Sequence, residues 1–559
     1  MKTFDTVAKL KLAKLKDGQF VETGGYYAKG DAGAARYLIV TPQSFDGYGD
    51  HELANGNVAV LQASTQVTIE HYGAQQNTDS SSAIRAAISA RGAKGVIVPA
   101  KRYLYDRTAI TEDNAKLIGE KTPTVSSAFT SLEGGSIIQG TIQFTGKNVH
   151  LENFGVDLGS DTGEAAGDGI KARYATINNG GNLHTEGLVA LLPSPSSTFH
   201  ALLFESYQKH TGGNLEGVHG FFGFVNKCQN VQLSNLQTKR NSSDGVYFKS
   251  DITDGKCSNV QVDSIIVDGN AGQTFGLRIQ SAGDDIENIS VGKVIIDGCA
   301  RPYKADLNGT NGTAIKNVHI NSLMCFNATS RDVHIENAKA ASSFIYNHVI
   351  DKLVCIDTLL EAYKVDGSGV VDFININDAF ISYKTGVSSG QMQAGGVQIK
   401  SNVLRTKVDK VTICQNYSSS LLGGINYENQ SSNNQLGMHT AKVLGSGSPL
   451  SGDSSQALSG TSAQLAVPNP AWNSRQCNAR VTISADTTII SFTENREGGV
   501  GALFETGTVL TVINNSGFNL TINHNYGGNI LNRGGASYVL AGNEAAMYLY
   551  GGAVWHQLN

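Results

Sequence analysis

Four acidic residues in the middle of the sequence could supply proton-transfer chemistry. They are Glu205, Asp244, Asp251 and Asp285. Hydrolysis of a glycosidic bond needs two carboxyl groups, one protonated to assist the leaving oxygen and one acting as base or nucleophile. Glu205 follows the apolar residues 202–204, and we expect this setting to raise its pKa toward that of a general acid. We therefore treat these four residues as the candidate catalytic residues.

A second group of residues combines an aromatic ring with several charges and suits a sugar polymer that carries acidic groups. Its members are Tyr247, Lys249, Arg278, Lys304 and Asp306. We expect them to bind substrate. A β-elimination would need a base such as Lys, Tyr or His and a cation that stabilises the enolate-like intermediate, and these could come from Tyr247, Lys249, Arg278 and His210. The residues alone leave hydrolase and lyase chemistry open.

A repeat of fixed length must position these side chains. Four segments read Asn, apolar, polar, apolar, and each begins 29 residues after the previous one; they start at Asn230, Asn259, Asn288 and Asn317. The alternation predicts a short strand with one buried face. A fixed period between roughly 20 and 50 residues indicates stacked repeats. Because each period has no room for a helix, we expect an all-β fold, a parallel β-helix.

The repeat also predicts which side chains face outward. Asn tolerates left-handed backbone geometry, so the recurring Asn suits a turn position. Aligning successive Gly-headed strands pairs Val246 with Leu277 inside and Tyr247 with Arg278 outside. Neighbouring coils lie ~4.8 Å apart and alternate coils ~9.6 Å. Neighbouring coils therefore suit the carboxyl separation of retaining hydrolases, about 5–5.5 Å, and alternate coils approach the inverting limit of roughly 9.5 Å.

Composition argues against several other functions. The 559 residues carry a net charge of −5, so no basic excess is available for nucleic acid. No apolar run approaches the 18 or so residues of a membrane span, and we expect no membrane insertion. The seven Cys and thirteen His residues lack metal-ligand spacing, so no metal or organic cofactor is expected. The Lys-rich N-terminal stretch is unlike a signal peptide, which predicts synthesis in a cytoplasm.

Three stretches outside the repeats carry recognisable motifs. Residues 24–37 read Gly-Gly-Tyr-Tyr-Ala-Lys-Gly-Asp-Ala-Gly-Ala-Ala-Arg-Tyr and resemble a signature near the start of many bacteriophage tailspikes. Tyr72-Gly73-Ala74, followed by Asp79 and residues 82–88, resembles the entry to a pectate-lyase-type right-handed β-helix. Residues 551–558 resemble the end of C-terminal β domains in phage fibres and spikes. Together these motifs bracket the repeats.

This resemblance implies a homotrimeric phage tailspike that depolymerises a capsular or O-antigen polysaccharide on the bacterial surface. The expected location is the virion tail. The signature begins within thirty residues of Met1, so for a member of this family we expect either another phage tail protein as an attachment partner or a sequence trimmed from a longer chain.

Pattern and resemblance together divide the chain into five parts. They are an N-terminal tail-attachment or neck module (1–66), a β-helix entry with a capping helix (67–110), the β-helix with its substrate groove (111–445), a Gly/Ser linker (446–468) and a C-terminal antiparallel, jelly-roll-like β-sandwich for trimerisation or carbohydrate binding (469–559). In the entry part, Ala83, Ile84, Ala87 and Ile88 share one face of a short helix over 80–90. We expect that helix to cover the open edge of the β-helix.

The leading hypothesis is a hydrolase that uses paired carboxylates on an acidic polysaccharide. A polysaccharide lyase is the first alternative. A non-catalytic receptor-binding spike, which would use the same face only to hold sugars, is the second.

Overall fold

The structure is a computed structural model of the 559-residue chain. It describes residues 1–62, 67–91, 94–158, 168–173, 181–195, 198–252, 255–269, 273–308, 312–339, 342–383 and shorter segments between 397 and 558. The chain forms two compact units, Met1–Ile320 and Asn321–Asn559. Strand β29 (Ala314–Phe326) contains the boundary between them.

The first unit begins with a small mixed sheet and one short helix. In chain order the elements are β1 (Lys2–Phe4), α1 (Val7–Lys11), β2 (Phe20–Thr23), β3 (Arg36–Val40), β4 (His51–Glu52) and β5 (Val58–Leu61). The Gly-rich signature is a loop built around Asp31. The Asp31 carboxylate accepts hydrogen bonds from the backbone N–H groups of Tyr26, Tyr27, Ala28 and Gly33, at 2.6–3.0 Å. The motif at 24–37 therefore has a structural explanation.

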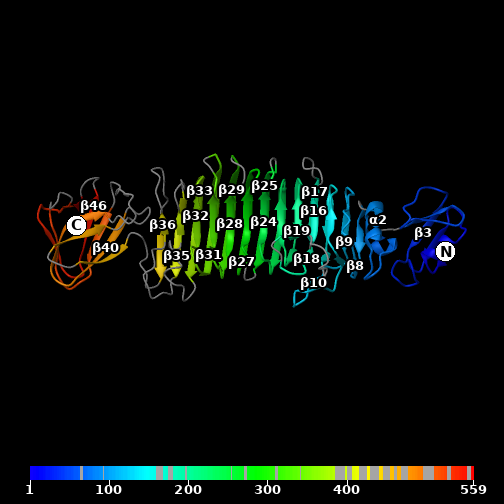
Figure 1. The fold of residues 1–559 in the computed structure, drawn as a ribbon, viewed down its shortest axis with the longest axis horizontal. Helices are drawn as coiled ribbons and strands as arrows, with labels where there is room; N and C mark the ends of the chain where they lie inside the picture. The colour runs from blue at the N-terminus through cyan, green and yellow to red at the C-terminus, as the bar shows by residue number, and fades with distance from the viewer. Residues whose placement is uncertain are drawn as a thin grey trace. The chain divides into compact units, whose positions relative to one another are not determined.

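The expected capping helix is present as α2 (Ser81–Arg91), which follows β6 (Val67–Thr68) and the 3-10 helix η1 (Ile69–Tyr72). Its four predicted apolar residues are all buried. The Asp79 carboxylate accepts a hydrogen bond from the Ser81 N–H at 3.0 Å, as is usual for a residue before a helix. Figure 1 shows α2 beside the first strands of the coils.

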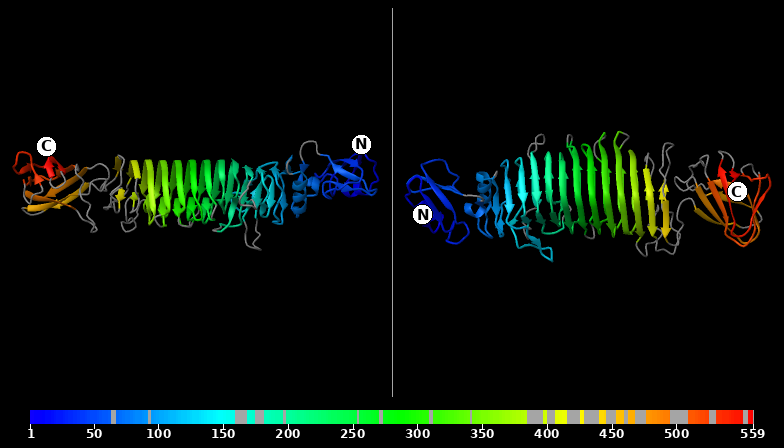
Figure 2. Two further views of the ribbon diagram at one scale, coloured as in Figure 1. Left: turned by 90° about the horizontal axis from the view of Figure 1, so that it is seen from above. Right: turned by 180° about the vertical axis from the view of Figure 1, so that it is seen from behind.

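The rest of the first unit consists of parallel coils, which confirms the predicted β-helix (Figures 1 and 2). Its first sheet contains β6, β7 (Val96–Val98), β8 (Arg102–Leu104), β9 (Lys116–Gly119), β12 (Ile137–Gln139), β14 (Val149–Glu152), β15 (Gly155–Asp157), β17 (Asn182–Glu186), β18 (Val189–Leu191), β20 (Lys209–Gly213), β21 (Leu215–Val218), β23 (Gln229–Lys239), β25 (Cys257–Asp268) and β27 (Ile286–Asp297). Its second sheet contains β13 (Ile142–Phe144), β16 (Ile170–Arg173), β19 (His200–Glu205), β22 (Phe221–Val225), β24 (Asp244–Ser250), β26 (Phe275–Ser281) and β28 (Arg301–Leu307). A short antiparallel hairpin, β10 (Thr124–Val125) and β11 (Leu132–Glu133), projects from the coils.

The repeated asparagines form a ladder along the first sheet. Asn230, Asn259, Asn288 and Asn317 all have positive φ, between 48° and 58°, which confirms their predicted left-handed geometry. The side-chain amides of Asn259, Asn288 and Asn317 each donate to the amide oxygen of the Asn one coil earlier, at 3.1, 3.0 and 2.9 Å. The 29-residue period is therefore held by both backbone pairing and side-chain hydrogen bonds.

The interior of the coils is apolar. Val231, Val260 and Ile289 stack in register, and each is at most 2% exposed. Phe224 and Phe248 stack with ring centroids 5.0 Å apart. The five described cysteines are buried and free.

The second unit continues with parallel strands. They are β31 (Phe344–Thr358), β33 (Val370–Tyr383), β35 (Thr406–Cys414) and β37 (Thr440–Leu444) in one sheet, and β30 (Val333–Asn337), β32 (Tyr363–Gly367), β34 (Val397–Ile399) and β36 (Ile425–Tyr427) in the other. The C-terminal strands follow: β38 (Asp453–Leu458), β39 (Ser462–Val467), β40 (Gln476–Ile483), β41 (Thr487–Glu494), β42 (Val509–Asn514), β43 (Leu520–Ile522), β44 (Ile530–Leu531), β45 (Tyr538–Leu540), β46 (Ala545–Tyr550) and β47 (Trp555–Gln557).

Two details of the C-terminal part differ from expectation. Strands β38 and β39 lie within residues 446–468, where the composition predicted a linker. The pairs β38–β40, β40–β42 and β39–β41 are parallel, whereas β42–β46 and β43–β45 are antiparallel. The alternation of apolar and polar residues predicts β-strands in this part of the chain, but it does not specify whether neighbouring strands run parallel or antiparallel. Among the described residues, no helix has both the length and the apolar character needed to cross a bilayer.

The ladder leads to a stability prediction for Asn288. We expect Asn288→Ala to destabilise the protein by about 2 kcal/mol, because it loses amide hydrogen bonds and places Ala at positive φ. Asn288→Gly should cost less, because Gly accepts that geometry. The free energies of unfolding of both variants in guanidinium separate the loss of the hydrogen bonds from the strain of Ala at positive φ. Gln261→Ala, at an exposed position of β25, is the control. Equal stability of wild type and Asn288→Ala would contradict a supporting role for the ladder.

Candidate active site

The outward side chains of β24, β26 and β28 form one face of the second sheet in the first unit. Tyr247 pairs with Arg278, and Arg278 pairs with Lys304. Lys249 and Asp306 lie in the neighbouring column, on either side of Gln280. The predicted register is therefore confirmed, and the five predicted substrate-binding residues share one face.

Asp306 is the counter-ion of Arg278. The guanidinium binds it with two hydrogen bonds, Nε to Oδ1 at 3.0 Å and Nη2 to Oδ2 at 3.1 Å. Gln280 and Asn308 donate further hydrogen bonds to Oδ2, at 2.8 and 3.1 Å. Lys304 Nζ lies 3.9 Å from the same oxygen. Asp306 is thus buried and well bonded, which suits it to orient Arg278 rather than to exchange protons.

Aromatic rings flank the same guanidinium. The Arg278 guanidinium carbon lies 5.3 Å from the Tyr247 ring centroid and 4.6 Å from that of Phe275. Tyr247 donates its hydroxyl hydrogen bond to Gln280. Burial raises the pKa of Tyr247, so the phenol stays protonated and is a poor base. The guanidinium is therefore held between two aromatic rings and its counter-ion Asp306.

Asp244 is the carboxyl group with the properties of a general acid. Its side chain is buried, and Oδ1 has no hydrogen-bond partner among the described residues. Oδ2 lies 3.9 Å from Arg278 Nη1. Burial raises the pKa of Asp244 to about 6, although Arg278 acts in the opposite direction. A carboxyl group with such a pKa can hold a proton near neutral pH and donate it.

The other three predicted catalytic carboxylates lie in different settings. Glu205, on β19, is buried and accepts a hydrogen bond from Asn226 at 3.2 Å. Asp251 follows β24 and forms an ion pair with Lys249 at 2.6 Å. Asp285 precedes β27 of the first sheet, where Lys316 Nζ lies 2.6 Å from its carboxylate. Asp251 therefore lies beside Lys249 of the predicted face, Glu205 lies two strands away from Lys249 in the same column of the second sheet, and Asp285 belongs to the edge of the other sheet.

Asp168 and His200 form a dyad that the sequence patterns did not reveal. His200 Nδ1 lies 2.8 Å from Asp168 Oδ1, and the His200 backbone N–H donates to the same oxygen at 2.9 Å. Lys171 Nζ lies 3.6 Å from Oδ2. Burial opposes ionisation, but the hydrogen bonds and charge of His200 hold the pKa of Asp168 below its usual value. An imidazole fixed at Nδ1 by a carboxylate is suited to accept a proton at Nε2.

The dyad lies beside the predicted face. His200 pairs with Phe221 on β22, and Gly223 of that strand pairs with Tyr247. A Cβ placed on Gly223 would lie 2.7 Å from His200 Nε2, so the missing side chain leaves room for the imidazole. No repeat predicts this contact, because 32 residues separate Asp168 from His200 and the register shifts between His200 and Leu202.

His210, the predicted alternative base, is unsuited to that role. It is fully enclosed in the interior, where its Nε2 lies 2.7 Å from the Thr185 hydroxyl. Burial lowers the pKa of His210 to about 3, so the ring stays neutral and away from solvent. The histidine with access to the face is His200.

Two groups in the second unit combine side chains that can ligate metals. His334, Glu336 and Asp366 lie together on β30 and β32, but Lys364 Nζ already lies 2.9 Å from Asp366 and compensates its charge. Burial works against ionisation, yet His334 and Lys364 hold the pKa of Asp366 far below its usual value. The other group is Cys325, Asp332 and Cys355, in the interior.

No protein-family model and no curated protein matches this sequence. Several solved structures do. The catalytic unit of a GH87 α-1,3-glucanase from Streptomyces thermodiastaticus HF3-3 is 16% identical, with a TM-score of 0.39 over 70% of this chain and 72% of that one. The tailspike gp42 of Acinetobacter phage vb_AbaP_AS12 is 12% identical, with a TM-score of 0.38 over 100% and 94%.

A third match is the tailspike gp49 of Acinetobacter baumannii bacteriophage Fri1, described as a capsular polysaccharide depolymerase. It is 13% identical, with a TM-score of 0.32 over 80% of this chain and 76% of that one. Similarities at this level assign no function to the chain, so the proposal below depends on its own residues.

The raised pKa of Asp244 predicts a specific pH dependence of stability. The unfolded carboxyl group ionises near pH 4 but the folded one only near 6, so wild-type stability should fall relative to Asp244→Asn across that interval. The difference in the free energy of unfolding between wild type and Asp244→Asn should change by about 2–3 kcal/mol over this interval and level off above pH 6. Melting curves of both proteins from pH 3.5 to about 7.5 test this. Parallel stability profiles would contradict the raised pKa.

Proposed function

We propose that the chain binds and depolymerises an acidic polysaccharide of the bacterial surface, as a phage tailspike enzyme in the virion tail. One observation supports cleavage most directly: the carboxyl group of Asp244, with its raised pKa, lies beside Arg278 on the face predicted to bind sugars. The phage and bacterial context rests on the sequence motifs at 24–37, 72–88 and 551–558.

Glycosidic hydrolysis fits this arrangement with one acid and one base. Asp244 would donate its proton to the glycosidic oxygen as the bond to the anomeric carbon breaks. His200 Nε2 would accept a proton from the attacking water, and Asp168 would stabilise the resulting imidazolium. The strands that carry Asp244 and His200 are separated by β22, so the two strands lie about 9.6 Å apart. That is close to the roughly 6.5–9.5 Å between acid and base in inverting enzymes.

Substrate binding would fall to the charged and aromatic residues of the same face. Arg278 is held by Asp306 and lies against Phe275, so its orientation is set before substrate arrives. Lys304 Nζ lies 5.4 Å from the Phe275 ring centroid. A uronate or another acidic sugar placed there would meet two cations and an aromatic surface.

β-Elimination is the second candidate reaction, and it is favoured by the cation at the dyad, because Lys171 Nζ lies 3.6 Å from Asp168 Oδ2. His200 would remove the proton next to a uronate carboxylate, Lys171 would stabilise the enolate-like charge, and water would protonate the leaving oxygen. The products of elimination contain a double bond and absorb ultraviolet light, whereas hydrolysis products do not. A receptor-binding spike without catalysis would leave the polysaccharide at its original length.

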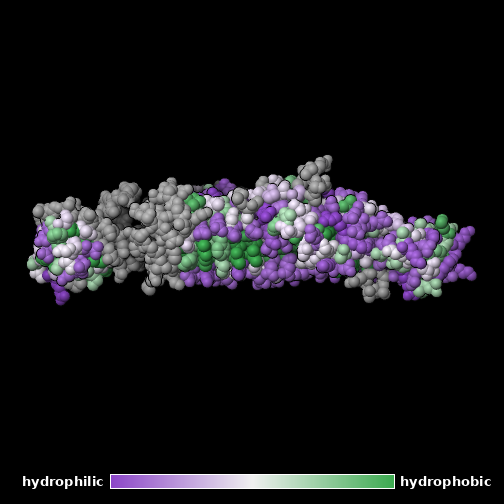
Figure 3. Space-filling model, turned by 90° about the horizontal axis from the view of Figure 1, so that it is seen from below, coloured by the Kyte–Doolittle hydropathy of each residue, from purple (hydrophilic) through white to green (hydrophobic). Residues whose placement is uncertain are grey.

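Trimer formation also belongs to the proposal. Figure 3 shows apolar side chains gathered in a patch with hydrophilic side chains around it. In the first unit, Ile266 and Ile295 pair in register and remain partly exposed. In the second unit, Val354 pairs with Phe380, which is 37% exposed. Clustered apolar side chains on a surface are typical of contacts between subunits. We propose that two further copies of the chain cover them, and that another tail protein attaches the trimer.

The catalytic assignment predicts the behaviour of two variants. Asp244→Asn and His200→Gln should each lower kcat by about 100-fold or more on capsular or O-antigen polysaccharide from the host, because each removes one proton-transfer group. Size-exclusion chromatography of the polymer and ultraviolet absorbance of the products measure cleavage and its type. Asp263→Asn, on the exposed part of β25, is the matched control. Full activity of Asp244→Asn would disprove its role as the acid.

The trimer proposal predicts a change in mass. Ile266→Asp should dissociate the trimer, because the new charge would be buried at the contact. Gln261→Asp places the same charge at an exposed position of the same strand and should leave the assembly intact. Light scattering on the purified proteins measures the masses. A trimeric Ile266→Asp variant, or a monomeric wild type, would contradict this interface.

A further inference from the structure

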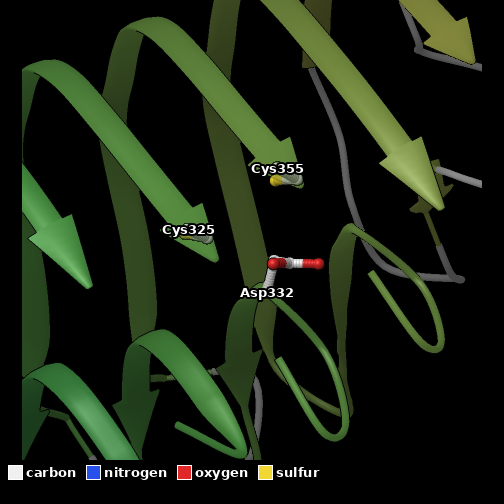
Figure 4. A group of neighbouring side chains, drawn as sticks. All are labelled: Cys325, Asp332 and Cys355. Atoms are coloured by element: carbon white, nitrogen blue, oxygen red, sulfur yellow. The ribbon is translucent and has the colours of Figure 1, made fainter. Parts of the chain in front are cut away.

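Two cysteines and an aspartate meet in the interior of the second unit. Cys325 lies near the end of β29, Cys355 lies on β31, and Asp332 immediately precedes β30. One ligand atom from each residue lies within 4.8 Å of the other two, and all three side chains are fully buried. Figure 4 shows the three side chains in the space between neighbouring coils.

The coil repeat explains why the sulfurs meet. Strands β29 and β31 are neighbours in one sheet, and Cys325 and Cys355 follow the buried residues Leu323 and Leu353 by two positions. Period-two alternation therefore turns both thiols inward. Asp332 enters from the connection after β29 and directs its carboxyl group to the same space.

The carboxyl group of Asp332 lacks the partners that a buried acid needs. Neither of its oxygens has a hydrogen-bond partner among the described residues. The Thr358 hydroxyl lies nearby and is buried as well. It also has no hydrogen-bond partner among the described residues. Buried polar groups are normally hydrogen-bonded, and buried charges are normally paired or coordinate a metal.

We propose that Cys325, Asp332 and Cys355 bind a thiophilic divalent cation of the Zn²⁺ class. Zn²⁺ prefers thiolate and carboxylate ligands at about 2.3 and 2.0–2.2 Å, which places ligand atoms ~3.5–3.8 Å apart. The ligand atoms here lie within 4.8 Å of one another and would move closer together on binding. The buried Thr358 hydroxyl is available as a fourth ligand. Two sulfurs exclude Ca²⁺ and Mg²⁺, which select oxygen ligands.

The site would be structural and independent of polysaccharide cleavage. Its complete burial leaves no open position for a substrate or a reactive water, so the ion would enter as the coils form. The competing explanation is a neutral cluster without metal, in which burial raises the pKa of Asp332 to about 8 and keeps it protonated. The two explanations differ in metal content, which can be measured directly.

The test measures zinc in the full-length protein. After expression in zinc-supplemented medium and dialysis, elemental analysis should find about one zinc per chain. The Cys325→Ser/Cys355→Ser double variant should lose it. The Cys228→Ser/Cys257→Ser variant should keep it, because that pair is also buried in the coils but belongs to no group with a carboxylate in the described part of the chain.

A second measurement covers the case in which the double variant fails to fold. Wild-type protein refolded with Co²⁺ should show the intense visible bands of a tetrahedral ion and the near-ultraviolet absorbance of sulfur ligation. Wild-type protein that holds no stoichiometric zinc and gives no such spectrum would overturn the proposal. Zinc that persists in a folded Cys325→Ser/Cys355→Ser variant would also overturn it.

Discussion

The in-register stacking of parallel coils is the constraint on which the rest of the structure depends. A single coil cannot bury its few inward side chains, so each coil is stable only against its neighbours. In the first unit the Asn ladder helps to fix this register: each Asn occupies a left-handed turn, and the last three bond to the Asn of the coil before them. A slip by one residue would expose the core and break the ladder together.

The same register brings together residues that lie about one coil apart in sequence. Arg278 meets Asp306 from the neighbouring coil, and Tyr247 and Phe275 cover the guanidinium. Asp244 is buried at the edge of this group, which raises its pKa to about 6. Stacking thus gathers charged side chains on one face. The two carboxyl groups there differ in their surroundings: Asp306 is an anion paired with Arg278, whereas Asp244 can carry a proton.

Inside the second unit, stacking also buries polar side chains. Alternation directs Cys325 and Cys355 to one point, and Asp332 joins them without a hydrogen-bond partner among the described residues. Fully apolar residues would fit a β-helix core with less loss of free energy. The buried carboxyl group of Asp332 therefore needs either a bound cation or a proton. Metal content distinguishes the two states.

The sequence by itself determined the coil repeat, the left-handed Asn turns, the capping helix and the outward pairing of Tyr247 with Arg278. These follow from local patterns that repeat at fixed spacing. Only the tertiary structure decided that Asp168 holds His200, that Asp285 lies apart from Asp244, and that Asp306 is neutralised by Arg278. The physical reason is that a period fixes direction and register, whereas burial, irregular connections and side-chain pairing depend on the surrounding coils.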